Sequence, residues 1–439
     1  MKQSKHNIYY SPKEVRTILE RSIDTALDGL KGYCNDPVSD FTRCRKLPAR
    51  TLIECIMSFS NYSSIGEMSH FFEGHGKMPS ASALSQRRQL LDPDIFKRIN
   101  NLFVSAFDDH TTINGYHILA QDGSDINIPF MDDKTKIENH DAKRYCQYHV
   151  NALYDCLNKV FYDWSIDAAS KKREVNALIS ILKNRNYPQN SIFTADRGYE
   201  SYNLMAHFIE NDIKFVIRVK DIHTKVGLMT NVRTEEGAFD MRISRTLTSL
   251  QTKEIKADKE KYIFVPTTSN FDFLDETRDF YDLSFRAVRF KISEDTYETV
   301  VTNLSEDEFG TDDFKELYHY RWNEETAFNK LKYTIGLIYF HARRRKLIQQ
   351  EINAAFLMYN VSEVIIRNIS VKKNKKLEYD YKINFSSAVT NIRLYLKKKI
   401  SVKELILRIK KFLVPRRPER SFERNMKSQS CKPLNYRTS

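Results

Sequence analysis

The hydrophobic periodicity of this 439-residue chain changes along its length, and the change restricts the folds open to it. Residues 11–108 carry apolar side chains at helical spacing, as at Leu52, Ile53, Ile56 and Phe59. Ser11 precedes a proline and stands three residues before a glutamate, which is typical of a helix start. The first quarter of the chain is therefore predicted to be helical.

From about residue 115, short apolar runs alternate with amphipathic segments. Helical periodicity then disappears between 220 and 304 and returns from Thr311 to about 368. This alternation predicts an α/β fold with a mixed sheet. The candidate strands are 117–121, 148–155, 159–167, 191–195, 214–219, 262–265, 285–292 and 299–302, and the candidate helices between them are 173–184 and 201–211.

The same changes predict the domain organisation. We expect a helical N-terminal domain at 1–112 that binds DNA, and a core made of 113–219 and 305–370. A β-rich insertion at 220–304 would interrupt the core. Residues 371–439 would form a basic C-terminal region whose end is disordered.

Positive charge is concentrated in that last region. The whole chain has a formal net charge of +13, and the segment from Val371 to Ser439 holds 20 Lys and Arg against five Asp and Glu, a net of +15. Such a segment suits a polyanion, either nucleic acid or an anionic membrane surface, and the alternative is a solvated tail. Arg416 and Arg417 are the first candidates for phosphate contacts.

Composition excludes several other classes. The six cysteines form no CxxC pair, so we expect reduced thiols rather than a zinc site or disulfides. The longest apolar stretch, near Ala354–Val361, is too short to cross a bilayer, and the N-terminal residues lack a signal peptide's apolar core. We expect a cytoplasmic protein without a membrane partner.

The segment Ser80–Leu91 carries Arg87 and Arg88 among small polar residues. It is a candidate recognition helix for a DNA groove. An ordinary core helix with an exposed basic face is the alternative, and the sequence does not separate the two.

Three acidic residues are candidate ligands for a metal ion that catalyses phosphodiester cleavage. Asp122 and Asp196 each follow an apolar strand, at Gln121-Asp122-Gly123 and at Ala195-Asp196-Arg197-Gly198. Ligands of α/β sheets gather at such strand ends, and carboxylates bind hard cations such as Mg²⁺. Asp125 is an alternative to Asp122.

The third acid, Glu325, belongs to a patterned helix predicted from Thr311 to about Thr334. At about 100° per residue, Tyr318, Arg321, Glu325 and Lys332 fall within a stripe about 60° wide. The apolar residues occupy the neighbouring arc. The alternative is an amphipathic helix on which Arg321 and Glu325 merely pair.

The pattern Tyr-x2-Arg-x3-Glu-x6-Lys at 318–332 resembles the YREK signature of bacterial insertion-sequence transposases typified by insertion sequence 4. Thr302-Asn303-Leu304, Trp322 and the motifs at Asp122 and Asp196 agree with that family in order and context. The resemblance covers about 115–340.

The resemblance implies a ribonuclease-H-like core with a β-rich insertion, and Asp122, Asp196 and Glu325 as the ligands of Mg²⁺, for which Mn²⁺ can substitute. Tyr318, Arg321 and Lys332 would contact phosphates near the element end. The partners implied are terminal inverted-repeat DNA, target DNA and a second copy of the chain in a synaptic complex. The protein would then associate with the bacterial nucleoid.

Many members of the family cut through a DNA hairpin, with a flipped base stacked on a tryptophan of the insertion. The two tryptophans here, Trp164 and Trp322, lie outside 220–304. Tyr262 or Phe264 are the candidate replacements, and the hairpin step stays open. Two other functions also stay open: a host nuclease of the same fold that cuts without joining, and a domesticated DNA-binding protein.

Overall fold

The computed structural model describes most of the chain. The described residues are 1–5, 8–43, 46–73, 78–138, 144–171, 173–222, 224, 226–234, 236–266, 268–269, 271–294, 296–371 and 379–416. None of the helices among them is long and apolar enough to span a membrane. The predicted disordered end of the C-terminal region, with Arg417, lies outside these residues.

The N-terminal region is helical, as predicted. The first helix, α1 (Pro12–Asp28), begins at a capping box in which Ser11 and Glu14 bond each other's backbone amides, and Pro12 takes the first helical position. A short strand, β1 (Gln3–Lys5), precedes it and pairs with β2 (Thr111–Ile113). The remaining elements are η1 (Leu30–Tyr33), α2 (Ala49–Met57), α3 (Ser64–Phe72), α4 (Ala81–Leu90) and α5 (Asp94–Val104).

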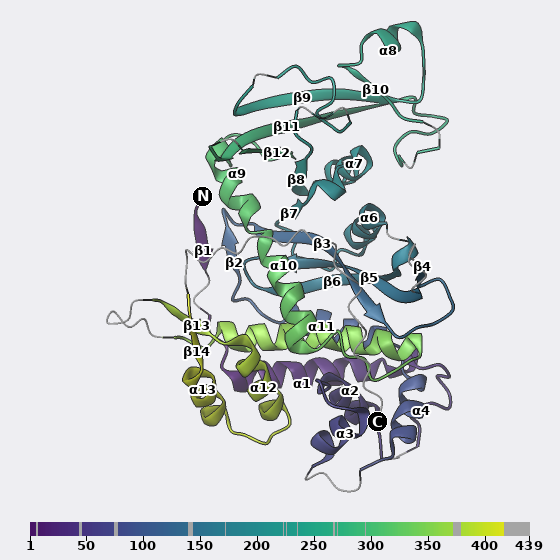
Figure 1. Ribbon diagram of the computed structural model, residues 1–439, viewed down its shortest axis with the longest axis vertical. Helices are drawn as coiled ribbons and strands as arrows, with labels where there is room; N and C mark the ends of the chain where they lie inside the picture. Colours follow the sequence, from purple (N-terminus) through teal and green to yellow (C-terminus); the bar gives the residue numbers. More distant parts are fainter. Residues whose placement is uncertain are drawn as a thin grey trace.

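A mixed sheet forms the centre of the molecule and, within the described residues, has ten strands (Figure 1). Its order is β10-β9-β11-β12-β8-β7-β3-β5-β4, with β6 also paired to β5. β3, β7 and β8 run parallel, and β5 is antiparallel to β3 and β6. The bounds are β3 (His117–Ile128), β4 (Lys136–Glu138), β5 (Arg144–Asp155), β6 (Val160–Ala168), β7 (Ser191–Ala195), β8 (Lys214–Val219), β9 (Phe239–Thr248), β10 (Tyr262–Phe264), β11 (Phe280–Ser293) and β12 (Thr296–Thr302).

Helices cover both faces of the part of the sheet that contains β3, β5, β6 and β8. α6 (Glu174–Asn184) packs on β3, β5 and β6, preceded by η2 (Ala169–Lys171), and α7 (Tyr202–Glu210) packs beside β8. The other face is covered by α10 (Trp322–Asn329) and the long α11 (Arg345–Arg367) (Figure 1). This mixed α/β arrangement with a large sheet fits a ribonuclease-H-like core.

The strands between 239 and 302 continue the same sheet, because β12 pairs antiparallel with β8. For this part of the chain the sequence predicted strands at 262–265, 285–292 and 299–302. It did not predict β9 or the short helix α8 (Lys253–Ala257). The charged residues of β11 differ in burial. Lys291 is exposed, but Arg289 is buried against Asp221, whose carboxylate accepts both of its forked hydrogen bonds.

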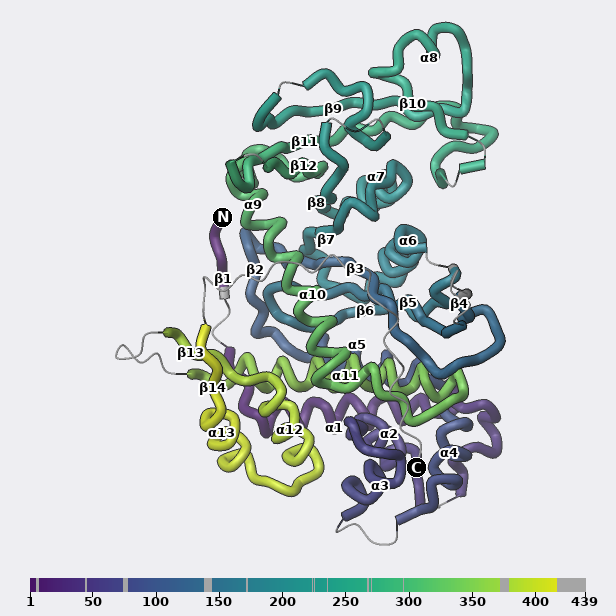
Figure 2. Tube along the Cα trace, in the orientation of Figure 1, coloured from purple at the N-terminus to yellow at the C-terminus, as the bar shows by residue number. Residues whose placement is uncertain are grey.

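The last described segment is folded rather than extended. It contains β13 (Tyr381–Ile383), α12 (Phe385–Leu396), α13 (Val402–Lys411) and β14 (Leu413–Pro415), and α12 packs on α11. The tube view shows this group beside α1 and α11 (Figure 2). Helices from both ends of the chain therefore pack in one hydrophobic core with α11. Leu19, Ile56 and Ile392 are all buried in it.

A buried chain of charges ties the N-terminal helices to α11. Arg88 of α4 bonds Glu351 of α11 at 2.7 Å, and His341 contacts Glu351 at 3.3 Å and Glu67 of α3 at 3.7 Å. Burial lowers the pKa of His341, but the contacts with Glu351 and Glu67 outweigh it and raise that pKa to about 9. The imidazole is therefore charged at neutral pH.

A group with a raised pKa stabilises the fold below its unfolded value of 6.5 and loses that contribution as pH rises through about 9. We expect the wild type to lose up to about 3 kcal/mol of unfolding free energy across this window through His341. Urea unfolding of His341→Gln should show a flatter pH dependence there. His319→Gln, at an exposed position, is the control, and parallel pH profiles for wild type and His341→Gln would contradict the assignment.

Candidate active site

The two aspartates lie side by side because their strands are neighbours. β3 and β7 pair in parallel with Gln121 opposite Ala195, so Asp122 and Asp196 take the next position on each strand. Asp196 follows the last residue of β7, as predicted, and its Oδ1 accepts the Gly198 amide at 2.8 Å. Asp122 does not end its strand: β3 continues to Ile128 because it also pairs with β5.

Arg321 connects Asp122 to the third acid. Its guanidinium lies 3.7 Å from Oδ2 of Asp122 and 3.4 Å from Oε1 of Glu325, one turn further along α10. The Arg321 side chain is only 5% exposed. One buried cation is thus shared between carboxylates of the sheet and of the helix.

The charges of Asp196 and Glu325 act on Asp122. Burial raises the pKa of Asp122 to about 6; the Gly123 amide and Arg321 oppose this, and Asp196 and Glu325 add to it. Glu324, next to Glu325, is fully buried, and burial raises its pKa well above the usual value, with Asp122 contributing. Neighbouring carboxylates of this kind favour a bound cation.

The predicted single helix from Thr311 to Thr334 is broken. The structure has α9 (Thr311–His319), α10 and a π-helical turn η4 (Lys330–Ile335). The break follows from i→i+3 hydrogen bonds from Arg321 to Tyr318 and from Glu324 to Arg321, which tighten the chain there. The residues of the predicted stripe are consequently spread over three consecutive elements, α9, α10 and η4, and the turn between α9 and α10.

The stripe residues lie in different surroundings. Tyr318 is buried, and its ring centroid is 5.7 Å from the Arg321 guanidinium carbon. The Lys332 ammonium donates to the backbone carbonyl of Asp125 at 2.9 Å. Arg321 and Lys332 thus contact β3, whereas Tyr318 and Glu325 lie against Arg321.

Asp125 belongs to the opposite face of β3, since side chains alternate along a strand. Its Oδ1 lies 2.6 Å from Nδ1 of His149, and Nε2 of His149 lies 3.2 Å from Glu174, the first residue of α6. His149 is fully buried and fills the space beneath Gly123. Asp125 thus holds a histidine rather than joining the acids around Arg321.

Sequence reasoning missed His149, Glu174 and Glu324. The helical periodicity used for the stripe places Glu324 about 240° from Tyr318, inside the apolar arc, and this was a usable signal for a buried acid. No comparable signal marks His149, because its partners come from two other elements.

The remaining predicted DNA contacts lie on or beside other elements than those of this site. Arg88 is 3% exposed and held by Glu351 and Gln350, so it is not on an exposed basic face. Arg87 donates to the Leu47 carbonyl at 3.2 Å. Arg416 is exposed, with its backbone amide bonded to Asp380. Tyr262 and the exposed Phe264 lie on β10, at the far end of the sheet order from β3.

Oxygen ligands in this arrangement suit a hard divalent ion. Among the described residues, no three His, Cys, Asp or Glu side chains stand close enough together to hold a metal as they are. The Arg321 guanidinium occupies the place between Asp122 and Glu325 instead. The donor chemistry fits a metal, and the positive charge of Arg321 marks where a cation is stabilised.

A mixed sheet that presents two aspartates on neighbouring parallel strands defines an α/β protein with a carboxylate-rich site. Residues 113–361, more than half of the chain, match the sequence profile of the family described as "Transposase DDE domain". The chain belongs to this family. Family membership supports transposition and implies nucleotidyl-transfer activity, and DDE transposases generally use divalent metal ions.

No curated protein matches the sequence. A solved structure described as a cryo-EM structure of "piggyBac transposase synaptic complex with hairpin DNA" is similar with a TM-score of 0.45 and 12% identity, over 93% of this chain and 84% of that one.

The packing beneath the site predicts the effect of one substitution. A Cβ added at Gly123 would lie 2.3 Å from Nε2 of His149, which is closer than side chains approach. Gly123→Ala should cost about 1–3 kcal/mol of unfolding free energy, because His149 is locked by Asp125 and Glu174. Urea unfolding measures this. Gly32→Ala is the control, because a Cβ there meets nothing within 4 Å. Equal unfolding free energies of the two variants would contradict the close contact between Gly123 and His149.

Proposed function

We propose that the chain is the transposase of a bacterial insertion sequence of the insertion-sequence-4 type, working by cut-and-paste. It would hydrolyse phosphodiester bonds at the terminal inverted repeats and join the freed 3′ ends to target DNA. The observation that supports this best is the adjacency of Asp122 and Asp196 across β3 and β7, with Glu325 linked to Asp122 through Arg321.

In this proposal Asp122, Asp196 and Glu325 hold Mg²⁺, or Mn²⁺ in its place. When bound, a divalent ion would supply positive charge that stabilises the attacking and leaving oxygens of the phosphodiester. Arg321 would then leave its place between the carboxylates and donate to a phosphate oxygen of the DNA end, because a guanidinium binds carboxylates and phosphates alike. Burial keeps water from competing for these contacts.

Two copies of the chain would grip paired element ends in the synaptic complex. The helical N-terminal domain (1–112) and the basic residues after Pro415, including Arg416 and Arg417, would hold DNA through its phosphates. We place the protein at the nucleoid, where its substrate is. The domain boundaries at 113–219 with 305–370, and at 220–304, remain part of this proposal.

The carboxylates can be tested with isosteric variants. Asp122→Asn, Asp196→Asn and Glu325→Gln should each lower cleavage of end DNA by at least about a hundredfold and leave DNA binding nearly unchanged, because they remove charged metal ligands. Glu316→Gln, an exposed position on α9, is the matched control. Cleavage and strand joining on labelled duplexes would be measured with Mg²⁺, Mn²⁺ and EDTA.

A variant that cuts at the wild-type rate, or cleavage that persists in EDTA, would refute the metal-binding role. Cutting without joining would identify a host nuclease. Specific DNA binding by a wild type that never cuts would identify a domesticated binding protein.

Arg321 and Lys332 should act on DNA ends rather than on bare cleavage. Arg321→Ala and Lys332→Ala should each weaken end-complex formation by about 1–3 kcal/mol, as expected when a charged contact is lost. Slow nicking of non-specific DNA with Mn²⁺ should survive. Gel shifts measure end-complex formation and nicking assays measure non-specific cleavage, both on the same folded preparations. Normal end binding by both variants would contradict the proposed role of Arg321 and Lys332.

The basic tail should contribute affinity without sequence preference. Truncation after Pro415 should weaken binding to all duplexes alike and reduce the slope of log K against log salt, because counterion release scales with phosphate contacts. Fluorescence anisotropy at several salt concentrations measures both quantities. Selective loss of affinity for the element ends alone would show that the tail reads bases.

A further inference from the structure

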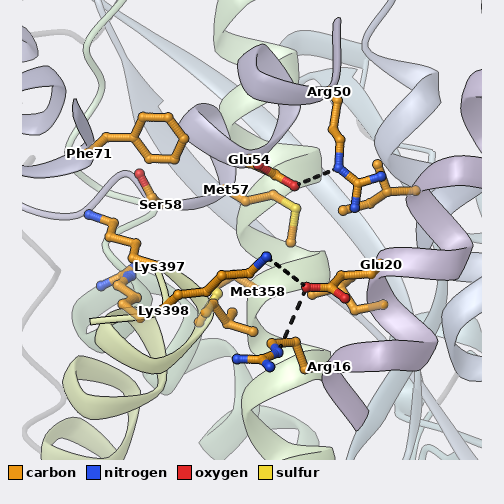
Figure 3. A pocket seen from close by; sticks show the side chains of 14 residues that line it. Arg16, Glu20, Arg50, Glu54, Met57, Ser58, Phe71, Met358, Lys397 and Lys398 are labelled. Carbon is orange, nitrogen blue, oxygen red and sulfur yellow. Dashed lines mark hydrogen bonds and ion pairs between the residues drawn. The ribbon is translucent and has the colours of Figure 1, made fainter. Parts of the chain in front are cut away.

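A cavity of about 370 Å³ lies between α1, α2, α11 and α12 (Figure 3). None of its lining residues belongs to the group around Asp122. Its apolar lining includes Met57, Phe71, Met358 and Leu396. The size and the apolar lining are those of a small-molecule site, which usually adds a few polar groups for orientation.

Arg393 is the first such polar group. It lines the cavity from α12, and its NH2 group donates to the Phe59 and Ile335 carbonyls, each at 2.8 Å. Its Nε atom is buried and makes no hydrogen bond with the described part of the chain. Burial lowers the pKa of Arg393 to about 10. The guanidinium is therefore held by neutral acceptors, without a carboxylate partner among the described residues.

Lys397 follows one helical turn later and also lines the cavity. It makes no ion pair with any residue that the structure describes, and its ammonium lies 5.9 Å from the centroid of the Phe71 ring. Burial lowers the pKa of Lys397 as well. Two cationic side chains that line one cavity are thus left without a carboxylate contact in the described chain.

The acids nearby are already engaged. Glu54 pairs with Arg50 at 3.0 Å, and Glu20 lies 3.8 Å from both Arg16 and Lys398, as the dashed lines in Figure 3 show. Glu67, a buried acid of α3 that does not line the cavity, accepts hydrogen bonds from the Ser60 and Tyr62 amides. The cavity therefore keeps an excess of positive charge next to an apolar wall.

We propose that this cavity binds a small amphiphilic anion, with a terminal phosphate or carboxylate against Arg393 and Lys397 and an apolar body against Phe71, Met57 and Met358. Burying a cation without an anion is costly, and a ligand anion would offset that cost. The apolar body would gain from leaving water.

Such a ligand would contact helices from both ends of the chain as well as α11. It would bind the folded arrangement of these helices and stabilise it by mass action. This site and its ligand are independent of the chemistry at Asp122.

Three probes separate the two halves of the proposed ligand: phenyl phosphate, inorganic phosphate and phenol, titrated into the full chain by calorimetry and thermal unfolding. Phenyl phosphate should bind at least about tenfold more tightly than inorganic phosphate or phenol and should raise Tm. Lys397→Met should weaken phenyl phosphate by about tenfold, since one charged contact is lost. Lys398→Met is the matched control, because its ammonium already faces Glu20.

Equal affinity for phenyl phosphate and inorganic phosphate would overturn the proposal in favour of an ordinary phosphate-binding surface. Unchanged binding by Lys397→Met, or no binding of phenyl phosphate by the wild type, would overturn it too. Arg393 also bonds two backbone carbonyls, so its loss can unfold the chain. Lys397→Gln, checked by its own melt, is therefore the second variant rather than a substitution of Arg393.

Discussion

The parallel pairing of β3 with β7 is the constraint on which the candidate site depends. It sets Gln121 opposite Ala195 and so brings together Asp122 and Asp196, which are separated by more than seventy residues of chain. β5 fixes the other edge of β3 and keeps Asp122 inside a continuous strand. A register shift of one residue would turn Asp122 toward His149 on the other face, because side chains alternate.

Arg321 completes the arrangement from the helical side. Its guanidinium balances carboxylates from β3 and α10 in a place shielded from water, where an uncompensated group of acids would repel strongly. In the proposed mechanism the three acids would close around a metal ion only after Arg321 had moved, and a DNA phosphate would offer the guanidinium another anion. Substrate binding and metal binding are coupled in this account through one side chain.

Local patterns predicted the elements with clear periodicity. The strands at 191–195 and 214–219 and the capped start of α1 were confirmed residue by residue, because buried runs and caps are local signals. The break at Arg321 was not predicted, since it depends on the i→i+3 bonds rather than on composition. β9 was missed although apolar and polar residues alternate from Phe239 to Ser244, which was a usable local signal for a strand.

Pairing between distant segments separates residues that look alike in the sequence. Asp122 and Asp125 look alike in the sequence, and only the alternation of β3 separates them, with one facing Arg321 and the other His149. Arg88 looked like a DNA contact, but its partner Glu351 lies more than 250 residues away, on α11. No local pattern reveals a partner at that distance.

The most direct test of the account is anomalous X-ray scattering from crystals of the full chain grown with end DNA and Mn²⁺. The account predicts manganese bound to the carboxylates of Asp122, Asp196 and Glu325, with the Arg321 guanidinium displaced onto a DNA phosphate. Manganese bound elsewhere, with Arg321 still between Asp122 and Glu325, would contradict it.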